Sequence, residues 1–457
     1  MKKLISLTLV TALGGTLSAC EIDVPDLNNP SIDDLETNPT ESSVTAACTG
    51  LLIGNRRGTA TANVGAVAQL GILGREAYNL DQADPRLIGE LLEGNLQAGS
   101  PFGGAFWGGA YANIRLANTI QRVAGQVAEF SAEEQSAIQG FSKTIEAHDL
   151  LEVINAHDTN GGVIDTDKRL DEPLGAVVDK PAMMAEIAAL LDAGAADLAA
   201  GGDEFPFALS GGYDGFDTPA TYVTVNRALR ARVAAYNEDY EVAKTALAAS
   251  FLNDGAMADF TTGVYHTYST ASGDTTNALI NPNLYAHPSL ETDQMALPDD
   301  RFAAKVMKVD PADAGGAGGL SSDLVFTIYA GPSAPVPIIR NEELILLKAE
   351  ALYFGTPADP AGALIALNKV RVEAGGLPPL VAADIDMPAE FTTRLLYERR
   401  YSLLFEGGHR WLDLRRFGQP LPLDMPDHTQ NVRFPLPLAE CNARPGEPRC
   451  MLGSSKR

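Results

Sequence analysis

The sequence predicts a mostly α-helical protein whose helices pack in pairs, with long irregular loops between the pairs. From about residue 41 onward, apolar and Ala-rich runs recur at the spacing of amphipathic helices. Gly, Pro and Asp separate these runs, and capping residues stand at several of their starts. With 457 residues and 45% hydrophobic content, the chain has ample material for a sizeable core.

The sequence indicates where several helices begin. Ser131 and Glu134 form a capping-box pattern that opens a long amphipathic helix. Asn341 is expected to cap a helix over residues 341–355, because two acidic residues follow it at the positive end of the helix dipole. An Asp-Pro pair then opens a second helix over residues 360–374, so these two helices form a hairpin.

Similar helical pairs recur along the chain. Residues 222–252 read as two helices joined by a turn at Asn237-Glu238-Asp239, and the stretch "ALRARVAAYNEDYEVA" resembles a hairpin of the tetratricopeptide (TPR) type. Residues 103–125 with 131–155 form a further candidate pair, as do residues 183–200 with the helix after them. The sequence therefore predicts degenerate TPR-like repeats.

Four segments between the pairs have no clear period and hold much of the Gly, Pro and Tyr: 157–181, 201–221, 254–300 and 309–337. Long loops on a rigid helical frame are where a binding face is usually built. The alternative is that they are exposed excursions without a function.

The N-terminal segment has the organisation of a bacterial export signal. Lys2 and Lys3 precede an apolar run from Leu4 to Leu13, and the stretch Leu17-Ser18-Ala19-Cys20 places small residues before a cysteine. This stretch resembles a lipobox, which implies cleavage before Cys20 and lipidation of that residue. The alternative is an ordinary cleaved signal with an incidental cysteine.

The expected domain organisation follows from this signal. Residues 1–19 form the signal peptide, and residues 20–40 form the lipid anchor with an extended tether rich in Pro, Asn and Asp. Residues 41–457 form the folded domain. The net charge of −25 repels phosphate backbones, so we expect no nucleic-acid partner.

A search for catalytic and metal-binding motifs finds no convincing candidate. The chain has no GxSxG, Walker A, HExxH or GxGxxG motif in a suitable context. His148 and Glu152 lie one helical turn apart but have no third ligand beside them. Cys441 and Cys450 flank a loop and can form a disulfide, whereas Cys48 lies in an apolar run and is expected to be an inert thiol. We therefore expect no metal and no cofactor.

The stretch "YERRYSLLFEGGHRWLDLRRFG" at residues 397–418 is unusually rich in charge. It sets Arg399, Arg400, Arg410, Arg415 and Arg416 among Glu398, Glu406 and Asp413. Either these arginines bind an anionic ligand, or they form bidentate ion pairs that hold helices together. We expect the structural role, with Trp411 packed beneath the charges.

This stretch belongs to a longer pattern that resembles the SusD/RagB family of nutrient-binding outer-membrane lipoproteins. The signature region spans about residues 335–440, and its matching elements follow the family's order: Arg340-Asn341-Glu342, Glu350-Ala351, Leu367-Asn368-Lys369-Val370-Arg371, Glu398-Arg399-Arg400, Glu406-Gly407 and Arg410 to Arg416. The segment "FWGGAYANIRLANTI" and the lipobox also resemble family segments.

The resemblance implies a SusD-like α-α superhelix of four TPR-like pairs that supports an irregular ligand face. It further implies a surface lipoprotein of the outer membrane that captures a nutrient, in the first place an oligosaccharide, and docks on a SusC-like TonB-dependent transporter. It implies no catalysis. The competing classes are a lipid-anchored surface hydrolase and a TPR-type scaffold that binds only proteins.

The candidate ligand-binding residues are aromatic, because pyranose rings stack their apolar faces on aromatic side chains. Trp107 and Phe102 lie in the glycine-rich segment "SPFGGAFWGGAY", where we expect exposed ring faces. Tyr265, Tyr268 and Tyr285 lie in irregular segments and are the further candidates. The alternatives are that Trp107 is a core residue and that the ligand is derived from peptide.

Overall fold

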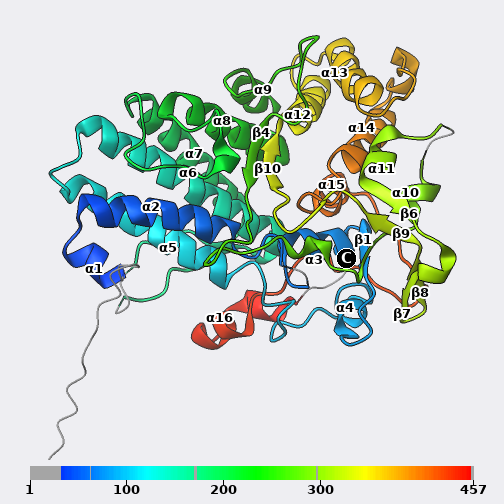
Figure 1. Ribbon diagram of the computed structural model, residues 1–457, viewed down its shortest axis with the longest axis horizontal. Helices are drawn as coiled ribbons and strands as arrows, with labels where there is room; N and C mark the ends of the chain where they lie inside the picture. Colours follow the sequence, from blue (N-terminus) through cyan, green and yellow to red (C-terminus); the bar gives the residue numbers. More distant parts are fainter. Residues whose placement is uncertain (1–31, 62, 169–171, 295–296, 454–457) are drawn as a thin grey trace, which may run out of the picture.

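The computed structural model describes residues 32–61, 63–168, 172–294 and 297–453, and it confirms the mostly helical class (Figure 1). The helices of these residues are α1 Ile32–Thr37, α2 Glu41–Arg56, α3 Ala66–Leu73, α4 Arg86–Gly89, α5 Gly108–Val123, α6 Ala132–His157, α7 Lys180–Ala199, α8 Pro219–Tyr236, α9 Tyr240–Ala248, α10 Ser289–Thr292, α11 Asp300–Lys305, α12 Asn341–Phe354, α13 Pro360–Glu373, α14 Pro388–Ser402, α15 His409–Arg416 and α16 Leu438–Ala443.

Seven of these helices form a continuous array in which each helix packs on the next, in the order α5, α6, α7, α8, α9, α12 and α13. The expected pairs α5–α6, α8–α9 and α12–α13 are confirmed, and α7 packs on α8. The predicted capping box at Ser131 is present. Gly140 of α6 permits a close approach to α7, because a Cβ there would lie 2.7 Å from the carbonyl oxygen of Gly194.

The strands are short and lie mostly beside the end of the array. Their bounds are β1 Ala77–Asn79, β2 Gly162–Val163, β3 Val177–Val178, β4 Gly263–His266, β5 Leu284–Ala286, β6 Val306–Lys308, β7 Gly315–Ala317, β8 Leu320–Ser322, β9 Leu324–Phe326 and β10 Val336–Arg340. One antiparallel sheet has the order β1-β5-β9-β6, and β10 pairs with β4 in a separate two-stranded sheet. The pair β10–β4 runs beside α8 and α12 (Figure 1).

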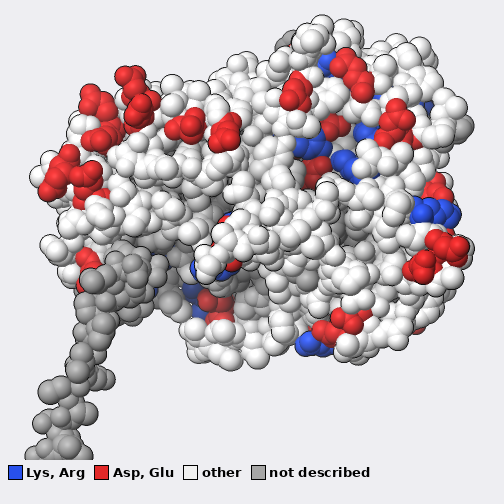
Figure 2. All heavy atoms as spheres, in the orientation of Figure 1, with Lys and Arg blue, Asp and Glu red and all other residues white. Residues whose placement is uncertain are grey.

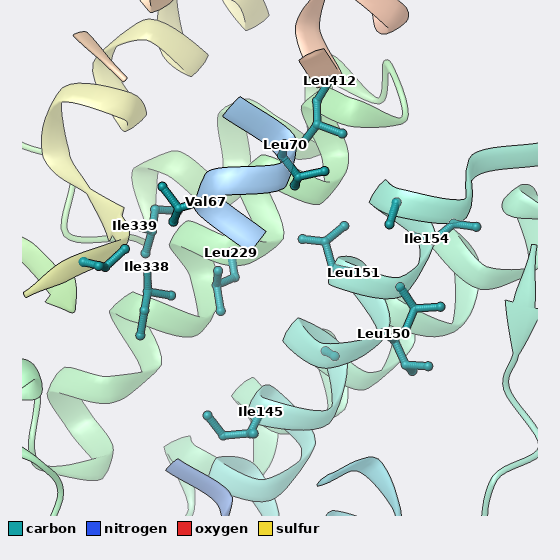
Figure 3. Packing of buried hydrophobic residues seen from close by; sticks show 14 of the residues in the cluster. Val67, Leu70, Ile145, Leu150, Leu151, Ile154, Leu229, Ile338, Ile339 and Leu412 are labelled. Atoms are coloured by element: carbon teal, nitrogen blue, oxygen red, sulfur yellow. The ribbon is translucent and has the colours of Figure 1, made fainter. Parts of the chain in front are cut away.

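The core joins the helical array to the segments around it. Side chains from α3, α6, α8, β10 and α15 meet in one buried cluster (Figure 3). Val67, Ile154 and Ile339 are each no more than 1% exposed. Burial of each such side chain contributes roughly 1.5–3 kcal/mol to folding, so this cluster fixes α3 and α15 against the array.

Two expectations about element boundaries are wrong. Residues 32–40 are not part of an extended tether, because Ile32–Thr37 is helical, Leu35 is buried and Arg122 of α5 binds Glu36. Asn341 is not an N-cap, because its side chain instead hydrogen-bonds the backbone N–H and carbonyl of Asn253. Residues 1–31, with the expected signal peptide and Cys20, lie outside the described part of the chain.

The arginines of residues 397–418 make structural contacts, as expected. Arg399 Nε of α14 lies 2.6 Å from Asp413 Oδ2 of α15, and Arg416 of α15 lies 2.8 Å from Glu350 of α12 and 3.0 Å from Asp413. We call these four residues the arginine seam. Their side chains are all less than 10% exposed. Trp411 is fully buried beside the seam and donates to the carbonyl oxygen of Asn431.

Further buried pairs extend the seam to neighbouring elements. Arg232 of α8 lies 2.6 Å from Glu343 of α12, and Arg340 Nε of β10 lies 2.8 Å from Glu406 Oε2. Arg400 binds Asp293, while Arg410 and Arg415 donate to the backbone carbonyls of Gly74, Asn155 and Val432. Each arginine therefore has a partner inside the fold.

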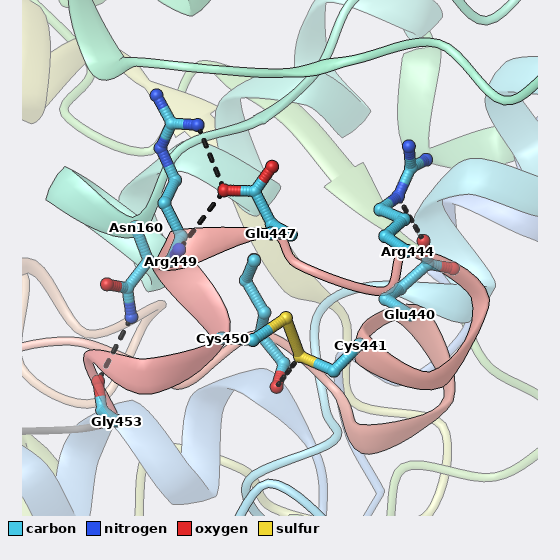
Figure 4. The surroundings of a disulfide bond; sticks show 9 residues. Asn160, Glu440, Cys441, Arg444, Glu447, Arg449, Cys450 and Gly453 are labelled. Atoms are coloured by element: carbon cyan, nitrogen blue, oxygen red, sulfur yellow. Dashed lines mark hydrogen bonds and ion pairs between the residues drawn. A yellow bond between two sulfur atoms is a disulfide. The ribbon is translucent and has the colours of Figure 1, made fainter.

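The C-terminal segment is fastened by a disulfide between Cys441 and Cys450 (Figure 4). Arg449 in the closed loop donates to the carbonyl oxygen of Val177, and Arg444 binds that of Gly175. The disulfide and these bonds hold the loop against β3 and the residues before it. Cys48 is fully buried, and burial raises the pKa of its thiol. Among the described helices, none combines the length and the apolar character needed to cross a bilayer.

An interior cavity of about 80 Å³ lies beside α6 and holds several polar groups, including His148, Glu152 and His409. Glu152 lines this cavity. Burial there, with a smaller effect of the Asp149 carboxylate, raises the pKa of Glu152 to about 8. The cavity therefore favours the neutral form of Glu152 near neutral pH.

Replacement of Glu152 is expected to stabilise the protein in alkaline solution. Between pH 4.5 and about 8, the Glu152 carboxyl keeps its proton in the folded protein but loses it in the unfolded chain. The free energy of unfolding therefore falls as pH rises through this range. Glu152→Gln should therefore raise the melting temperature more at pH 9 than at pH 5. The matched control is Glu133→Gln, an exposed position at the start of α6. The same pH dependence in both variants would contradict the assignment.

Loss of Arg399 is expected to destabilise the fold strongly. Arg399→Ala leaves the Asp413 carboxylate buried with one arginine fewer, and breaking such a pair costs about 3–5 kcal/mol of unfolding free energy. Urea unfolding measures this loss. The control is Arg86→Ala, which breaks a pair between Arg86 and Asp84 in which the arginine side chain is 51% exposed. Comparable stability of both variants would show that the seam is dispensable.

Candidate functional site

Two adjoining hollows lie where the C-terminal end of α2 meets the segment that follows β4. The first has a volume of about 490 Å³ and the second about 410 Å³. Both are lined by Ile53, Arg56, Gly273 and Asp274, so they are continuous at these residues. We call them the first and second lobes of a two-lobed cleft.

The lining of the cleft combines aromatic rings, hydroxyl groups and aliphatic surface. The first lobe holds Thr49, Leu52, Ala208, Leu209, Ser210, Tyr213, Tyr265, His266 and Thr267 in addition to the shared residues. The second lobe holds Arg57, Gly58, Ala60, Thr61, Tyr268, Thr275, Thr276 and Ala278. Ile53, which is 50% exposed, gives both lobes an apolar surface.

An ion pair marks the junction between the lobes. Arg56 Nη2 lies 2.6 Å from Asp274 Oδ1, and Arg56 also donates to the carbonyl oxygen of Thr267. Its guanidinium carbon lies 5.5 Å from the centre of the Tyr268 ring. Arg56 thus ties the end of α2 to the segment after β4 and stands between the two lobes.

Strand pairing, a turn and a close approach at a glycine position the segments that line the cleft. β4 pairs with β10 with Tyr265 opposite Pro337, which sets the direction of the chain leaving β4. The backbone N–H of Ser269 then donates to the carbonyl oxygen of Thr275, 3.1 Å away, so the segment turns back toward α2. On the other side, Gly212 lets a turn approach β4, because a Cβ there would lie 1.9 Å from the carbonyl oxygen of Tyr265.

The charge states of the lining groups follow from their surroundings. Burial lowers the pKa of His266 to about 3, with a smaller effect of neighbouring His148, so this imidazole is neutral at physiological pH. The hydrogen bond from Arg56 lowers the pKa of Asp274, as does the backbone N–H of Thr275 to a smaller extent. Burial raises the pKa of Tyr268, which keeps its phenol protonated.

The arrangement is suited to binding a polar, ring-shaped ligand. Aromatic faces pack on apolar ring surfaces, and Ser, Thr and Tyr hydroxyls both donate and accept hydrogen bonds. Hydrolysis of a glycosidic bond generally needs two carboxyl groups on opposite sides of the bond. Asp274 is the single carboxylate in the described lining of the two lobes.

The structure brings two of the predicted ligand-binding residues together. Tyr265 lines the first lobe and Tyr268 the second. Tyr285 lies elsewhere, on β5, opposite Tyr78 of β1. One side of its half-buried ring is covered by β7, because a Cβ at Gly315 would lie 2.3 Å from that ring.

The expected exposure of Trp107 and Phe102 is wrong. Trp107 is 4% exposed and Phe102 is 1% exposed. The Trp107 ring packs edge-on against His157, 5.0 Å between ring centres, and only its margin reaches a separate pocket of about 230 Å³ beside Tyr111. Glycine in this segment permits close packing: a Cβ at Gly103 would lie 2.0 Å from the carbonyl oxygen of Gln97. The glycines therefore help to bury the aromatic rings.

Residues of the cleft that the sequence-based prediction omits include Arg56, Arg57 and Asp274. A signal for the arginines is present in "GNRRGTA", where two adjacent arginines end a helix in a strongly acidic chain. No comparable signal marks Asp274. Its position depends on the turn after β4, which brings residues 274 and 56 together across more than two hundred residues of sequence.

Trp107 is expected to contribute to stability. Trp107→Ala removes a buried aromatic side chain and should lower the free energy of unfolding by about 3–5 kcal/mol. Urea unfolding measures the loss, and Met257→Ala, at a position 93% exposed, is the control with little expected effect. Unchanged stability of Trp107→Ala together with lost ligand binding would restore the role predicted from the sequence.

Part of the chain matches a known protein family in sequence. Residues 327–444, which contain the arginine seam, match the sequence profile of the SusD family. No curated protein sequence matches the chain significantly.

Solved structures share the fold at low sequence identity. A SusD superfamily protein from Bacteroides vulgatus has a TM-score of 0.66 at 14% identity, with 89% of this chain and 97% of that chain covered. A SusD-like carbohydrate-binding protein from Bacteroides fragilis has a TM-score of 0.65 at 16% identity, with 88% and 98% covered. A laminarin-binding SusD-like protein has a TM-score of 0.59 at 16% identity, with 88% and 98% covered. Residues 327–444 thus match the SusD family in sequence, and the chain as a whole shares the fold of SusD-like proteins.

Proposed function

We propose that this protein is a nutrient-binding surface lipoprotein that captures an oligosaccharide in the two-lobed cleft. The cleft carries the proposal, because it joins Tyr265 and Tyr268 to a row of hydroxyl groups in two adjoining lobes. Sugars present apolar C–H faces and a periphery of hydroxyls, and this lining offers a partner for each. The laminarin-binding and carbohydrate-binding proteins of the same fold support the choice of ligand class.

The proposal includes the place and the partner of the protein. Cys20 carries the lipid that anchors the chain to the outer membrane, and the domain passes its ligand to a SusC-like TonB-dependent transporter without changing it chemically. The N-terminal Leu17-Ser18-Ala19-Cys20 stretch and the family assignment support this reading.

Tyr265→Ala and Tyr268→Ala should each weaken oligosaccharide binding. Stacking of a base on an aromatic ring contributes about 1–3 kcal/mol, and a similar scale for sugars corresponds to roughly 5-fold to 150-fold in the dissociation constant. Calorimetry against a panel of oligosaccharides and peptides measures the affinities, and chromatography of the recovered ligands tests for turnover. Thermal unfolding of each variant shows whether the domain is intact.

The comparison variant is Tyr285→Ala, at a half-buried tyrosine outside the cleft. Unchanged affinity in this variant and a loss in the two cleft variants would support the cleft. The reverse result would move the site to the sheet that contains β1 and β5. Ligand turnover would establish a hydrolase, and binding of peptides alone would establish a protein-binding scaffold.

A further inference from the structure

The two lobes of the cleft differ in charge. The first lobe contains Arg56 and Asp274, which neutralise each other, and the neutral His266. The second lobe contains the same pair and also Arg57. The second lobe therefore carries one positive charge in excess, in a chain whose net charge is −25.

Arg57 is placed to act on a ligand. It follows the last residue of α2 and is exposed. Arg56 next to it binds Asp274 and Thr267, whereas the guanidinium of Arg57 has no hydrogen bond or ion pair with any residue that the structure describes. Its five N–H donors are thus open to a planar carboxylate or to a sulfate.

The groups around Arg57 fit a sugar that bears such an anion. The hydroxyls of Thr61, Thr275 and Thr276 line the same lobe, and the Tyr268 ring, which is 6% exposed, borders it. The only carboxylate in the described lining, Asp274, is already bound by Arg56 at 2.6 Å. Asp274 therefore repels an anion at Arg57 only weakly, because Arg56 neutralises the Asp274 carboxylate.

We propose that the ligand is an acidic oligosaccharide, with a carboxylate- or sulfate-bearing unit in the second lobe beside Arg57 and a neutral unit in the first lobe. This inference rests on the proposed function and adds the charge class and orientation of the ligand. Arg56 separates the two units, and Tyr265 supplies the aromatic surface of the neutral subsite.

The test uses pairs of oligosaccharides that differ only in charge. Oligogalacturonides are compared with their methyl esters, chondroitin sulfate oligosaccharides with their desulfated forms, and sialyllactose with lactose. At least one acidic member should bind more tightly than its neutral counterpart. Its affinity should fall as salt is raised from about 0.01 M to about 1 M, because the Debye length shortens from roughly 30 Å to roughly 3 Å.

Three variants test whether Arg57 causes the preference for acidic ligands. Arg57→Gln should weaken binding of the acidic ligand about 10-fold to 100-fold, the scale of one hydrogen-bonded charge, and leave the neutral counterpart unchanged. Arg57→Lys keeps the positive charge and should retain part of the preference. Arg394→Gln, on α14 and outside the cleft, is the matched control and should bind as the unaltered protein does.

The outcomes separate this inference from the proposed function. Neutral oligosaccharides that bind in the cleft as tightly as their acidic counterparts would overturn the charge preference and leave the proposed function standing. Failure of every oligosaccharide to bind would overturn both. An Arg57→Gln variant that keeps the acidic preference would also overturn the inference. Lower stability with unchanged selectivity would assign Arg57 to the negative end of the α2 dipole instead.

Discussion

The rest of the structure depends on the buried ion pairs of the arginine seam. Arg399, Asp413, Arg416 and Glu350 join α12, α14 and α15, three helices that form no single hairpin. Removing one partner of such a pair leaves an uncompensated charge in a medium of low polarity, which is far more costly than losing the pair as a whole. The seam thus penalises any arrangement in which one of these helices is displaced from the others.

The same network reaches the candidate ligand site. Arg340 at the end of β10 binds Glu406 after α14, so the seam region holds β10 in place. β10 pairs with β4, and the chain leaving β4 carries Thr267 and Asp274 to Arg56. One wall of the cleft is therefore fixed by the signature region and the other by α2, and Arg56 joins them.

The helical pairs and the seam were predictable because their signals are local: capping residues, apolar spacing and a dense charged motif. Ser131 and Arg399 illustrate this, since each has the role that its neighbours in sequence indicate. The cleft was only partly predictable, because residues near 53, 210 and 270 meet through long-range packing. The sequence marks Tyr265 and Tyr268 as aromatic residues in an irregular segment, but it carries no sign of their relation to Arg56. Trp107 shows the opposite error, since its flanking glycines allow close packing that buries the ring.

Two kinds of charge act on an anionic ligand of this cleft: the distant surface carboxylates and the nearby guanidinium of Arg57. At physiological ionic strength the Debye length is about 8 Å, so distant carboxylates act weakly on an approaching anion. Figure 2 shows acidic side chains gathered over the end of the molecule that carries α6 and α7. A guanidinium at contact distance acts within that length and through directed hydrogen bonds. Selectivity for charge in this cleft therefore arises at contact, through Arg57, while the acidic surface does not draw the ligand in.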